Sequence, residues 1–413
     1  MGERVGIEVS LAASEAVKMA NVDVVAAYPI TPQTHIVEHL SQLVADGELD
    51  AEFIPVESEH SAMSVCCGSS AVGARTFTCT SSQGLALMNE IVFIAASLRL
   101  PIVMLLANRS LSGPLSIWND HTDVMSIRDC GWIQVFAENG QEVFDHVLFA
   151  FRVAEDPNVC LPVIVNVDGF VLTHMIEPLE FWDETTVKKY LPDFKPVNQL
   201  HPDKPITMGA FGMPIIFTEA KKAQDEALIK SKTEIFKAWK EMGDLVGRNY
   251  QPVETNHLEG ADTVFLTMGS IGETVSLAVN ELRSRGKAVG QVRLRLWRPF
   301  PFEELREAVK GVKRIIVIDR AISYGGPGGP VASEIRAALY KERTMPVITN
   351  FLCGFAGRDV TADDFIKMYE KIKEFKPRAN PPLTENMIRR GQTYKCCVCE
   401  SRNLVETSIN IEY

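Results

Sequence analysis

The sequence predicts an α/β protein built on parallel sheets, and three features of the chain predict it. Short runs rich in valine, isoleucine and leucine alternate with longer segments in which apolar residues recur at helical spacing. The runs are apolar at successive positions, which is typical of strands covered on both faces. Polar residues are sparse within the runs and gather directly after them. This alternation indicates a parallel sheet with helices on both sides.

The first 180 residues contain the clearest alternation. After the first strand, Thr31 and Pro32 are suited to begin a helix, because threonine can cap a helix and proline fits its first turn. Small residues after Glu59 suit a helix that packs closely on a sheet. We expect strands at 22–27, 53–56, 75–80, 101–106, 133–137 and 162–167, and helices after Pro32, at 61–74, from Leu85 and at 142–154.

The polar side chains that follow these strands indicate a binding site. In open parallel sheets the ligand lies beyond the carboxyl ends of the strands. The residues expected at that edge are Thr31, Glu59, Ser81, Gln83, Arg109 and Asp168.

The remainder of the chain predicts a connector, a second α/β domain and a tail. Residues 181–258 contain several prolines and then a charged helix near 218–242, which is typical of a connector. Residues 259–375 again alternate between strands and helices, and residues 376–413 are expected to form an extended tail. In the second domain we expect strands at 264–268, 289–296 and 314–318, and helices at 274–285, 302–309 and 331–340.

Composition narrows the class of protein. A chain of 413 residues is too long for one ordinary domain. Its 42 basic and 53 acidic residues give a net charge of −11, so neither nucleic acid nor an anionic membrane is expected as the main partner. No apolar run is long enough for a transmembrane helix and no signal peptide is recognisable, so we expect a cytoplasmic protein. The nine cysteines are scattered, which fits reduced thiols better than a disulfide framework.

Six motifs, in this order, carry a resemblance to a known family. The motifs are Tyr28–Pro32, Glu57–His60, Thr80–Met88, Asn108–Arg109, Trp118–His121 with Arg128–Trp132, and Val167–Phe170. With these motifs the sequence resembles the alpha subunits of the multi-subunit 2-oxoacid:ferredoxin oxidoreductases, of which pyruvate synthase is the best-known member.

The resemblance implies a fold and a set of partners. Residues 1–180 would form the pyrimidine-binding domain of a thiamine diphosphate enzyme, and residues 259–375 a domain like the C-terminal domain of transketolases. The diphosphate, its Mg²⁺ and an iron–sulfur cluster would lie on a beta subunit, with further clusters on gamma and delta subunits. Electrons would pass to ferredoxin or another acceptor, and coenzyme A would be the co-substrate. The chain would then be half of an active site.

The resemblance also implies roles for single residues. Glu59 would bind N1′ of the aminopyrimidine, because a carboxylate there favours the imino tautomer that deprotonates the thiazolium ring. Thr31 and Arg109 would bind the 2-oxoacid, since arginine matches a carboxylate as a planar fork. Ser81 and Gln83 would contact the cofactor, and His121 would contact the site from a loop. No metal site is expected on this chain itself.

Several alternatives stay open. Pyruvate is the expected substrate, but aryl or branched-chain 2-oxoacids such as phenylglyoxylate would need the same residues. A non-catalytic scaffold is a second alternative, and a nucleotide-binding module is a third, although no Gly-x-Gly-x-x-Gly pattern follows the first strand. Arg109 could pair with Asp120 or Asp123 instead of substrate. We interpret the glycine-rich stretch 325–330 as a rigid turn, and Cys396, Cys397 and Cys399 as reduced thiols rather than metal ligands.

Overall fold

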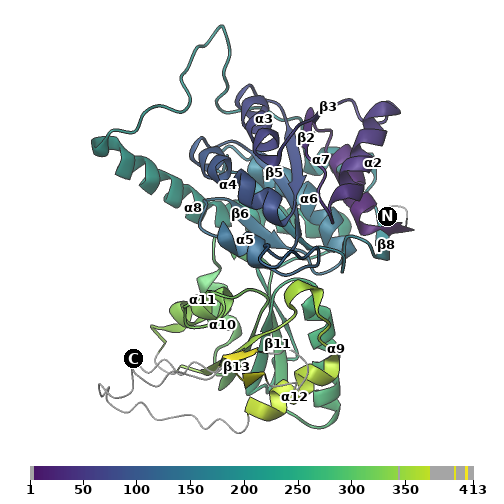
Figure 1. Cartoon of the computed structure of the whole chain (residues 1–413), viewed down its shortest axis with the longest axis vertical. Coiled ribbons are helices and arrows are strands. Elements are labelled where there is room, and N and C mark those ends of the chain that lie inside the picture. Colours follow the sequence, from purple (N-terminus) through teal and green to yellow (C-terminus); the bar gives the residue numbers. More distant parts are fainter. Residues whose placement is uncertain (1–3, 343–344, 373–394, 397–404, 408–413) are drawn as a thin grey trace. The chain divides into compact units, whose positions relative to one another are not determined.

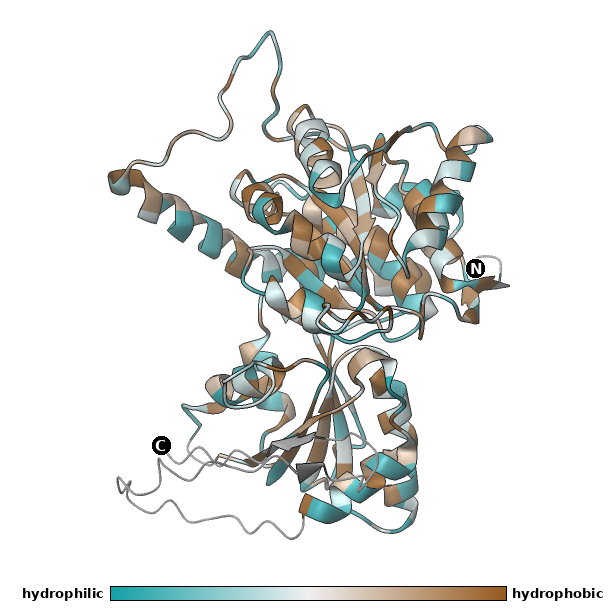
Figure 2. Ribbon diagram, viewed as in Figure 1, coloured by the Kyte–Doolittle hydropathy of each residue, from teal (hydrophilic) through white to brown (hydrophobic). Residues whose placement is uncertain are grey.

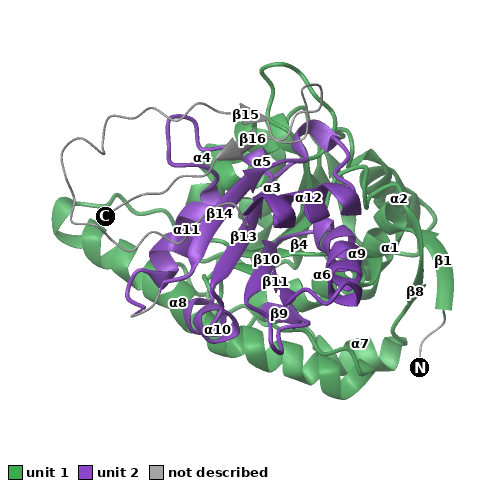
Figure 3. Ribbon diagram, turned by 90° about the horizontal axis from the view of Figure 1, so that it is seen from below, with its two compact units in different colours: residues 1–119, 123–252, 295–300 green, residues 120–122, 253–294, 301–413 purple. Residues whose placement is uncertain are grey.

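The computed structural model describes residues 4–342, 345–372, 395–396 and 405–407. The chain divides into two compact units, which Figure 3 colours separately. Unit 1 comprises Met1–Asn119, Asp123–Pro252 and Arg295–Phe300. Unit 2 comprises Asp120–Thr122, Val253–Leu294 and Pro301–Tyr413.

Unit 1 is built on a sheet with the strand order β12-β6-β7-β5-β4-β2-β3. Its strands are parallel apart from β12, which pairs antiparallel with β6 at one edge. All the strands predicted in the first 180 residues lie in this sheet, so the parallel architecture is confirmed. Their bounds are β2 (Val24–Ala27), β3 (Glu52–Pro55), β4 (Thr76–Thr80), β5 (Ile102–Asn108), β6 (Ile133–Phe136), β7 (Val163–Asp168) and β12 (Leu296–Arg298).

Helices cover the sheet of unit 1 on both faces (Figure 1). Helices α1, α2 and α6 pack on one face, and α3 and α4 pack against each other on the other. A short antiparallel pair, β1 (Arg4–Glu8) with β8 (Ile176–Glu180), lies beside the main sheet. The helices are α1 (Val9–Met19), α2 (Thr34–Ala45), α3 (Glu59–Ala71), α4 (Ser82–Ser97), α5 (Thr122–Ser126), α6 (Gly140–Ala154), α7 (Glu184–Tyr190) and α8 (Pro214–Val246).

Local sequence explains where several of these helices begin. The side chains of Ser58, Asn139 and Asp183 stand at the N-cap positions of α3, α6 and α7 and accept a hydrogen bond from a backbone N–H of the first turn. Such caps satisfy donors that the helix itself cannot pair. The cap on α3 places Glu59 at the first helical position, after a three-residue connection from the end of β3.

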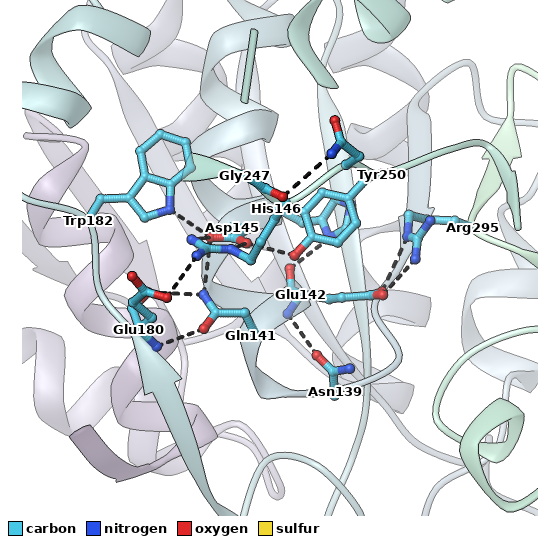
Figure 4. Close-up of polar contacts among 12 residues, drawn as sticks. Asn139, Gln141, Glu142, Asp145, His146, Glu180, Trp182, Gly247, Tyr250 and Arg295 are labelled. Atoms are coloured by element: carbon cyan, nitrogen blue, oxygen red, sulfur yellow. Dashed lines mark hydrogen bonds and ion pairs between the residues drawn. The ribbon is translucent and has the colours of Figure 1, made fainter. Parts of the chain in front are cut away.

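A network of buried polar groups joins α6 to the segment after α8 (Figure 4). Asp145 is fully buried, and both its carboxylate oxygens accept hydrogen bonds from Arg248, at 2.6 and 2.9 Å. The hydroxyl of Tyr250 and the indole N–H of Trp182 donate to the same carboxylate at 2.7 and 2.8 Å. These bonds fix the C-terminal half of α8 and its following loop to unit 1.

The predicted connector therefore differs from what the structure contains. Residues 181–252 cluster with unit 1 instead of standing apart, because the C-terminal half of α8 is amphipathic and buries one face. Ile235, Ala238, Trp239 and Met242 enter the same hydrophobic core as α1 and α6.

Unit 2 contains a second sheet with the order β15-β16-β14-β13-β10-β11-β9. Strands β14, β13, β10 and β11 are parallel, and antiparallel strands flank them. Helices α9 and α12 pack together over one core of this unit. The elements are β9 (Val253–Asn256), β10 (Thr263–Thr267), α9 (Ile271–Ser284), β11 (Val289–Leu294), α10 (Phe302–Ala308), β13 (Arg314–Asp319), α11 (Pro330–Leu339), β14 (Val347–Leu352), the 3-10 helix Phe355–Gly357, α12 (Ala362–Ile372), β15 (Lys395–Cys396) and β16 (Val405–Thr407).

Two details of unit 2 bear on the sequence predictions. The strand predicted at 289–296 is divided: β11 ends at Leu294, and β12 belongs to the sheet of unit 1 because it pairs with β6. The glycine-rich stretch is a turn before α11, and the backbone N–H groups of Val331 and Ala332 donate to the carboxylate of Asp319 at 2.9 and 3.0 Å. An internal carboxylate thus takes the place that an anion would use.

Two further predictions concern the C-terminal tail and membrane-spanning helices. Apart from β15 and β16, the predicted tail lies outside the described residues, as do the side chains of Cys396, Cys397 and Cys399. Within the described part of the chain, none of the helices combines the length and the apolar character that crossing a membrane requires.

Candidate active site

Five strands of unit 1 deliver the predicted residues to one edge of the sheet. Strands β2, β3, β4, β5 and β7 run parallel, so their carboxyl ends meet at the same edge. Close backbone packing holds that edge together: a Cβ atom on Gly169, after β7, would lie 2.5 Å from both the carbonyl oxygen of Asn108 and Cγ of Pro32. The segments that follow β2, β5 and β7 are therefore in direct contact.

Glu59 is a buried carboxylate at this edge. Its exposed fraction is 7%, and among the residues that the structure describes its carboxylate has no hydrogen-bond or ion-pair partner. It packs on the first turn of α4, where a Cβ atom on Gly84 would lie 2.6 Å from Oε1 of Glu59. The same Cβ would lie 2.4 Å from Oγ1 of Thr80, a buried hydroxyl that also lacks a partner within the described residues. Glycine at position 84 is required for this approach.

The N-terminal ends of two helices meet at Glu59. The carboxylate belongs to the first turn of α3 and lies against the first turn of α4. The N-terminal ends of helices carry partial positive charge from their unpaired N–H groups. Two helix N-termini, rather than a basic side chain of the described residues, therefore border the Glu59 carboxylate.

Arg109 follows β5 and is held by three hydrogen bonds. Its backbone N–H donates to the carboxylate of Asp123 at 2.8 Å. Its guanidinium donates from Nε to the carbonyl oxygen of Ser116 at 2.7 Å and from Nη1 to that of Thr31 at 2.9 Å. Burial lowers the pKa of Arg109 from its ordinary value, and the nearby charge of Asp123 opposes that shift. In the described part of the chain Nη2 has no partner, so one edge of the fork is available to a ligand.

Thr31 lies beside Arg109, but the prediction that it caps a helix is wrong. Helix α2 begins at Thr34, with Gln33 at the N-cap position. The reason is a turn in which the N–H of Gln33 donates to the carbonyl oxygen of Ile30 at 2.9 Å. Thr31 is exposed in this turn and meets Arg109 through its backbone carbonyl. Contact of its side chain with substrate stays a prediction.

Ser81 and Gln83 begin the segment that leads into α4. The hydroxyl of Ser81 donates to the carbonyl oxygen of Ala107 at 2.5 Å, which ties the end of β4 to that of β5. The amide oxygen of Gln83 accepts from the hydroxyl of Ser82 at 2.5 Å. Both side chains thus have partners within the chain, and their predicted cofactor contacts stay predictions.

His121 belongs to the other compact unit. It clusters with Asp120 and Thr122 in unit 2, is 2% exposed, and its backbone N–H donates to the carbonyl oxygen of Arg320 at 2.8 Å. The predicted contact of His121 with the site stays a prediction.

Two residues that organise this edge were missed as site residues. Asp123 was considered as an ion-pair partner of Arg109, yet its fully buried carboxylate accepts three hydrogen bonds from two separate segments. The donors are the backbone N–H groups of Arg109 and Ser82 and the side-chain amide of Asn108, at 2.8, 3.2 and 3.1 Å. Gln33 is fully buried and its amide donates to the carbonyl oxygen of Tyr28 at 2.8 Å. For Gln33 the available signal was a polar residue at the start of a predicted helix; for Asp123 it was an acid in the loop that follows Arg109.

Family models match both parts of the chain. The model described as pyruvate flavodoxin/ferredoxin oxidoreductase, thiamine diphosphate-binding, matches residues 15–239. The model described as pyruvate:ferredoxin oxidoreductase core domain II matches residues 261–365.

Curated relatives are similar over most of the chain. Pyruvate synthase subunit PorA of Methanocaldococcus jannaschii is 47% identical over 366 residues, which cover 88% of this chain and 93% of that protein. The PorA subunit of Pyrococcus furiosus is 46% identical over 370 residues, covering 88% and 93%. Ketoisovalerate oxidoreductase subunit VorA of Pyrococcus abyssi is 45% identical over 365 residues, covering 88% and 92%.

Solved structures support the fold. A 2-oxoglutarate:ferredoxin oxidoreductase from Magnetococcus marinus, solved with 2-oxoglutarate, coenzyme A and succinyl-CoA bound, has a TM-score of 0.65 at 20% identity, covering 90% of this chain and 65% of that one. A split gene transketolase, described as an inactive beta4 tetramer, has a TM-score of 0.53 at 14% identity, covering 89% and 98%. The fold shared with both is the one predicted: a thiamine-enzyme sheet domain and a transketolase-like second domain.

Proposed function

The chain belongs to the alpha-subunit family of the 2-oxoacid:ferredoxin oxidoreductases, and we propose that it supplies the pyrimidine-binding half of their active site. It is a subunit of an oxidoreductase that acts on a 2-oxoacid with coenzyme A. Pyruvate is the proposed substrate, because the relatives with the highest identity among those named above are pyruvate synthase subunits. A branched-chain 2-oxoacid is the second candidate, since the ketoisovalerate subunit matches almost as well.

One observation carries the proposal: Glu59 is buried and lacks a partner among the described residues. Burying a carboxylate without a hydrogen-bond donor is costly, so a folded protein retains such a group where a donor comes from outside the chain. A protonated ring nitrogen, such as N1′ of an aminopyrimidine, is a donor of the required kind. The unpaired hydroxyl of Thr80 beside it offers a second polar contact.

The residues at this edge fit thiamine diphosphate and a 2-oxoacid together. When bound, thiamine diphosphate would supply the nucleophile for the carbonyl carbon and an electron sink for decarboxylation. Glu59 would hold the ring nitrogen, and Ser81 and Gln83 would contact the cofactor from the start of α4. Arg109 would orient the carboxylate of the substrate with Nη2, and Thr31 would contact the carbonyl group. Arg109 needs only to orient this carboxylate, because binding it too tightly would oppose its departure as CO₂.

Partner subunits complete the proposed enzyme. A beta subunit would bind the diphosphate, its Mg²⁺ and an iron–sulfur cluster, and gamma and delta subunits would carry electrons to ferredoxin or another acceptor in the cytoplasm. The exposed side of α4 offers a surface for the beta subunit, since this helix starts beside Glu59 and exposes Leu87, Phe93 and Ile94. A site formed by both subunits would exclude water from the reacting groups.

Replacing Glu59→Gln in the assembled complex tests the proposal. We expect 2-oxoacid-dependent dye reduction to fall by up to about 10⁴-fold, because the amide cannot exchange a proton with the ring. The matched control is Glu57→Gln, which changes an exposed carboxylate two residues earlier. Wild-type activity in the Glu59→Gln complex would refute the proposed role. Turnover with pyruvate against 2-oxoisovalerate on the wild-type complex would separate the two substrate candidates.

A further inference from the structure

The start of α8 and the loop before it form an exposed apolar segment. Residues 201–223 are exposed apart from half-buried Met208, and Figure 2 shows hydrophobic colouring at the free end of α8. We call residues 206–217 the apolar arm. Its large apolar side chains include two that are more than four-fifths exposed, Phe211 at 84% and Ile215 at 81%. The members are Ile206, Phe211, Met213, Ile215, Ile216 and Phe217.

This surface is large enough to serve as one side of a protein interface. Typical areas of such side chains, scaled by their exposed fractions, leave on the order of 700 Å² of apolar surface in water. A stable interface buries about 800 Å² on each partner. Exposed apolar surface of this extent is uncommon on a protein without partners and marks an interaction site.

The apolar arm continues onto the exposed side of α4. Helices α4 and α8 touch at Ser97, where Nζ of Lys221 lies 3.1 Å from the serine hydroxyl and Oε1 of Gln224 lies 3.3 Å from it. Phe93 and Ile94 lie one turn before Ser97 on α4, and Phe217 lies one turn before Lys221 on α8. On both helices, therefore, apolar residues lie one turn before this contact, on the same side of the helix.

The α4 side of this surface begins at the candidate active site. The first turn of α4 contacts Glu59 through Gly84, and Leu87 is the next large apolar residue along the helix that is exposed. A macromolecule that covers Glu59 and follows the exposed side of α4 reaches the contact at Ser97 and then the arm. The charges near the arm are of both signs, with Glu219 beside Lys221 and Lys222, so a strongly charged electron acceptor is not the partner that this surface fits.

We propose that the apolar arm and the exposed side of α4 form one docking surface for the subunit that binds the diphosphate of the coenzyme. The inference rests on the proposed function, because that subunit is the one that must approach Glu59. The arm lies at the far end of α4 from Glu59, so its role is to hold the partner in place rather than to touch the reacting groups.

Replacing Ile216→Asp and Phe217→Asp together in the full complex tests the docking surface. We expect the diphosphate-binding subunit to dissociate from the variant at a protein concentration at least about 10-fold higher than from the wild type. Mass photometry of diluted samples measures this concentration. Both residues are about half exposed, so the circular dichroism and thermal unfolding of the variant should match the wild type. The matched control is Ile229→Asp, which places the same charge on an exposed residue of α8 beyond the contact with α4.

Two outcomes would overturn the proposal. One is that the double variant loses the diphosphate-binding subunit at the same protein concentration as the wild type. The other is loss of contact between two copies of this chain while the diphosphate-binding subunit stays bound, which would make the arm a self-association surface. Hydrogen exchange gives a second measurement: binding of that subunit should protect residues 206–217.

The docking test and the function test can fail separately. A Glu59→Gln complex should dissociate at the wild-type concentration and lack activity, whereas the arm variant should recover wild-type turnover per complex once it is assembled at high concentration. Full activity of Glu59→Gln would refute the proposed function, and the dilution experiment would still decide whether the arm binds this subunit.

Discussion

Asp145 and Glu59 are both buried acids on helices of unit 1, and their surroundings differ completely. Asp145, on α6, accepts hydrogen bonds from Arg248, Tyr250 and Trp182 (Figure 4). Glu59, on α3, has no partner in the described part of the chain. The difference teaches that burial of an acid does not by itself indicate function. A carboxylate with its partners in place stabilises the fold, whereas one without them is ready to bind a ligand.

Of the changes in stability predicted here, the largest is expected when Asp145 is replaced. Asp145→Asn should lower the free energy of unfolding by about 3–5 kcal/mol, because it leaves the guanidinium of Arg248 without its buried counter-charge. Urea unfolding of the purified protein measures the change. Asp244→Asn is the control, since that carboxylate is exposed and pairs with Lys240 at the surface. A loss below about 1 kcal/mol would show that the pair of Asp145 and Arg248 stabilises the fold no more than an exposed ion pair does.

The neighbouring His146 should make the same region sensitive to acid. Burial lowers the pKa of His146 to about 4, although Glu142 and Asp145 oppose the shift. Between that value and the ordinary value of 6.5 the unfolded chain binds the proton and the folded chain does not. The free energy of unfolding should therefore rise with pH from 4 to 6.5, by up to about 3 kcal/mol, and stay level above.

The control for this pH dependence is His146→Phe. The variant keeps an aromatic ring beside Phe149 and Trp239 but cannot titrate. Unfolding measured across the same pH range should show a smaller slope than the wild type. An unchanged slope would assign the acid sensitivity to another group.

Arg109 lies at the same edge of the sheet as Glu59 and gives the next prediction. Arg109→Lys should raise the KM for the 2-oxoacid by about 10- to 100-fold, because a lysine cannot hold two carbonyl oxygens and offer a third donor in one plane. Steady-state kinetics of the assembled complex measure the change. Arg128→Lys, at a more exposed arginine, should leave KM unchanged. A fall in kcat with unaltered KM would place Arg109 outside the binding of substrate.

The smallest expected effect is on the stability of Glu59→Gln. The amide replaces a buried carboxyl group that has no partner within the described residues, so the free energy of unfolding should change by less than about 0.5 kcal/mol or rise. Urea unfolding beside Asp145→Asn gives the direct contrast. A large destabilisation would mean that Glu59 is a structural acid like Asp145.

The pattern of residues along the chain was sufficient for the fold class and the family. The strands of the first sheet, from Val24 in β2 to Asp168 in β7, were predicted to within a few residues, because a strand covered on both faces is apolar at successive positions. The order of motifs around Glu59, Ser81 and Arg109 was sufficient to identify the family, which the comparisons confirm. These are properties of short segments, and local sequence contains them.

Tertiary structure decided which polar groups find a partner, and the sequence could not. Thr31 was expected to cap a helix, but a turn closed by Gln33 moves the start of α2 to Thr34. Asp123 was one of two loop acids, and only folding brings the ends of β4 and β5 to its carboxylate.

The same limit applies to segments that join the fold over long distances. Trp239 and Arg248 lie in a stretch that was expected to be a connector, yet Trp239 is in the core of unit 1 and half-buried Arg248 bonds to the buried carboxylate of Asp145. Periodicity reports whether a helix has an apolar face, but not which surface that face will meet. Hydrogen bonds and packing between residues a hundred positions apart depend on the whole fold, so they distinguish Asp145 from Glu59 only in three dimensions.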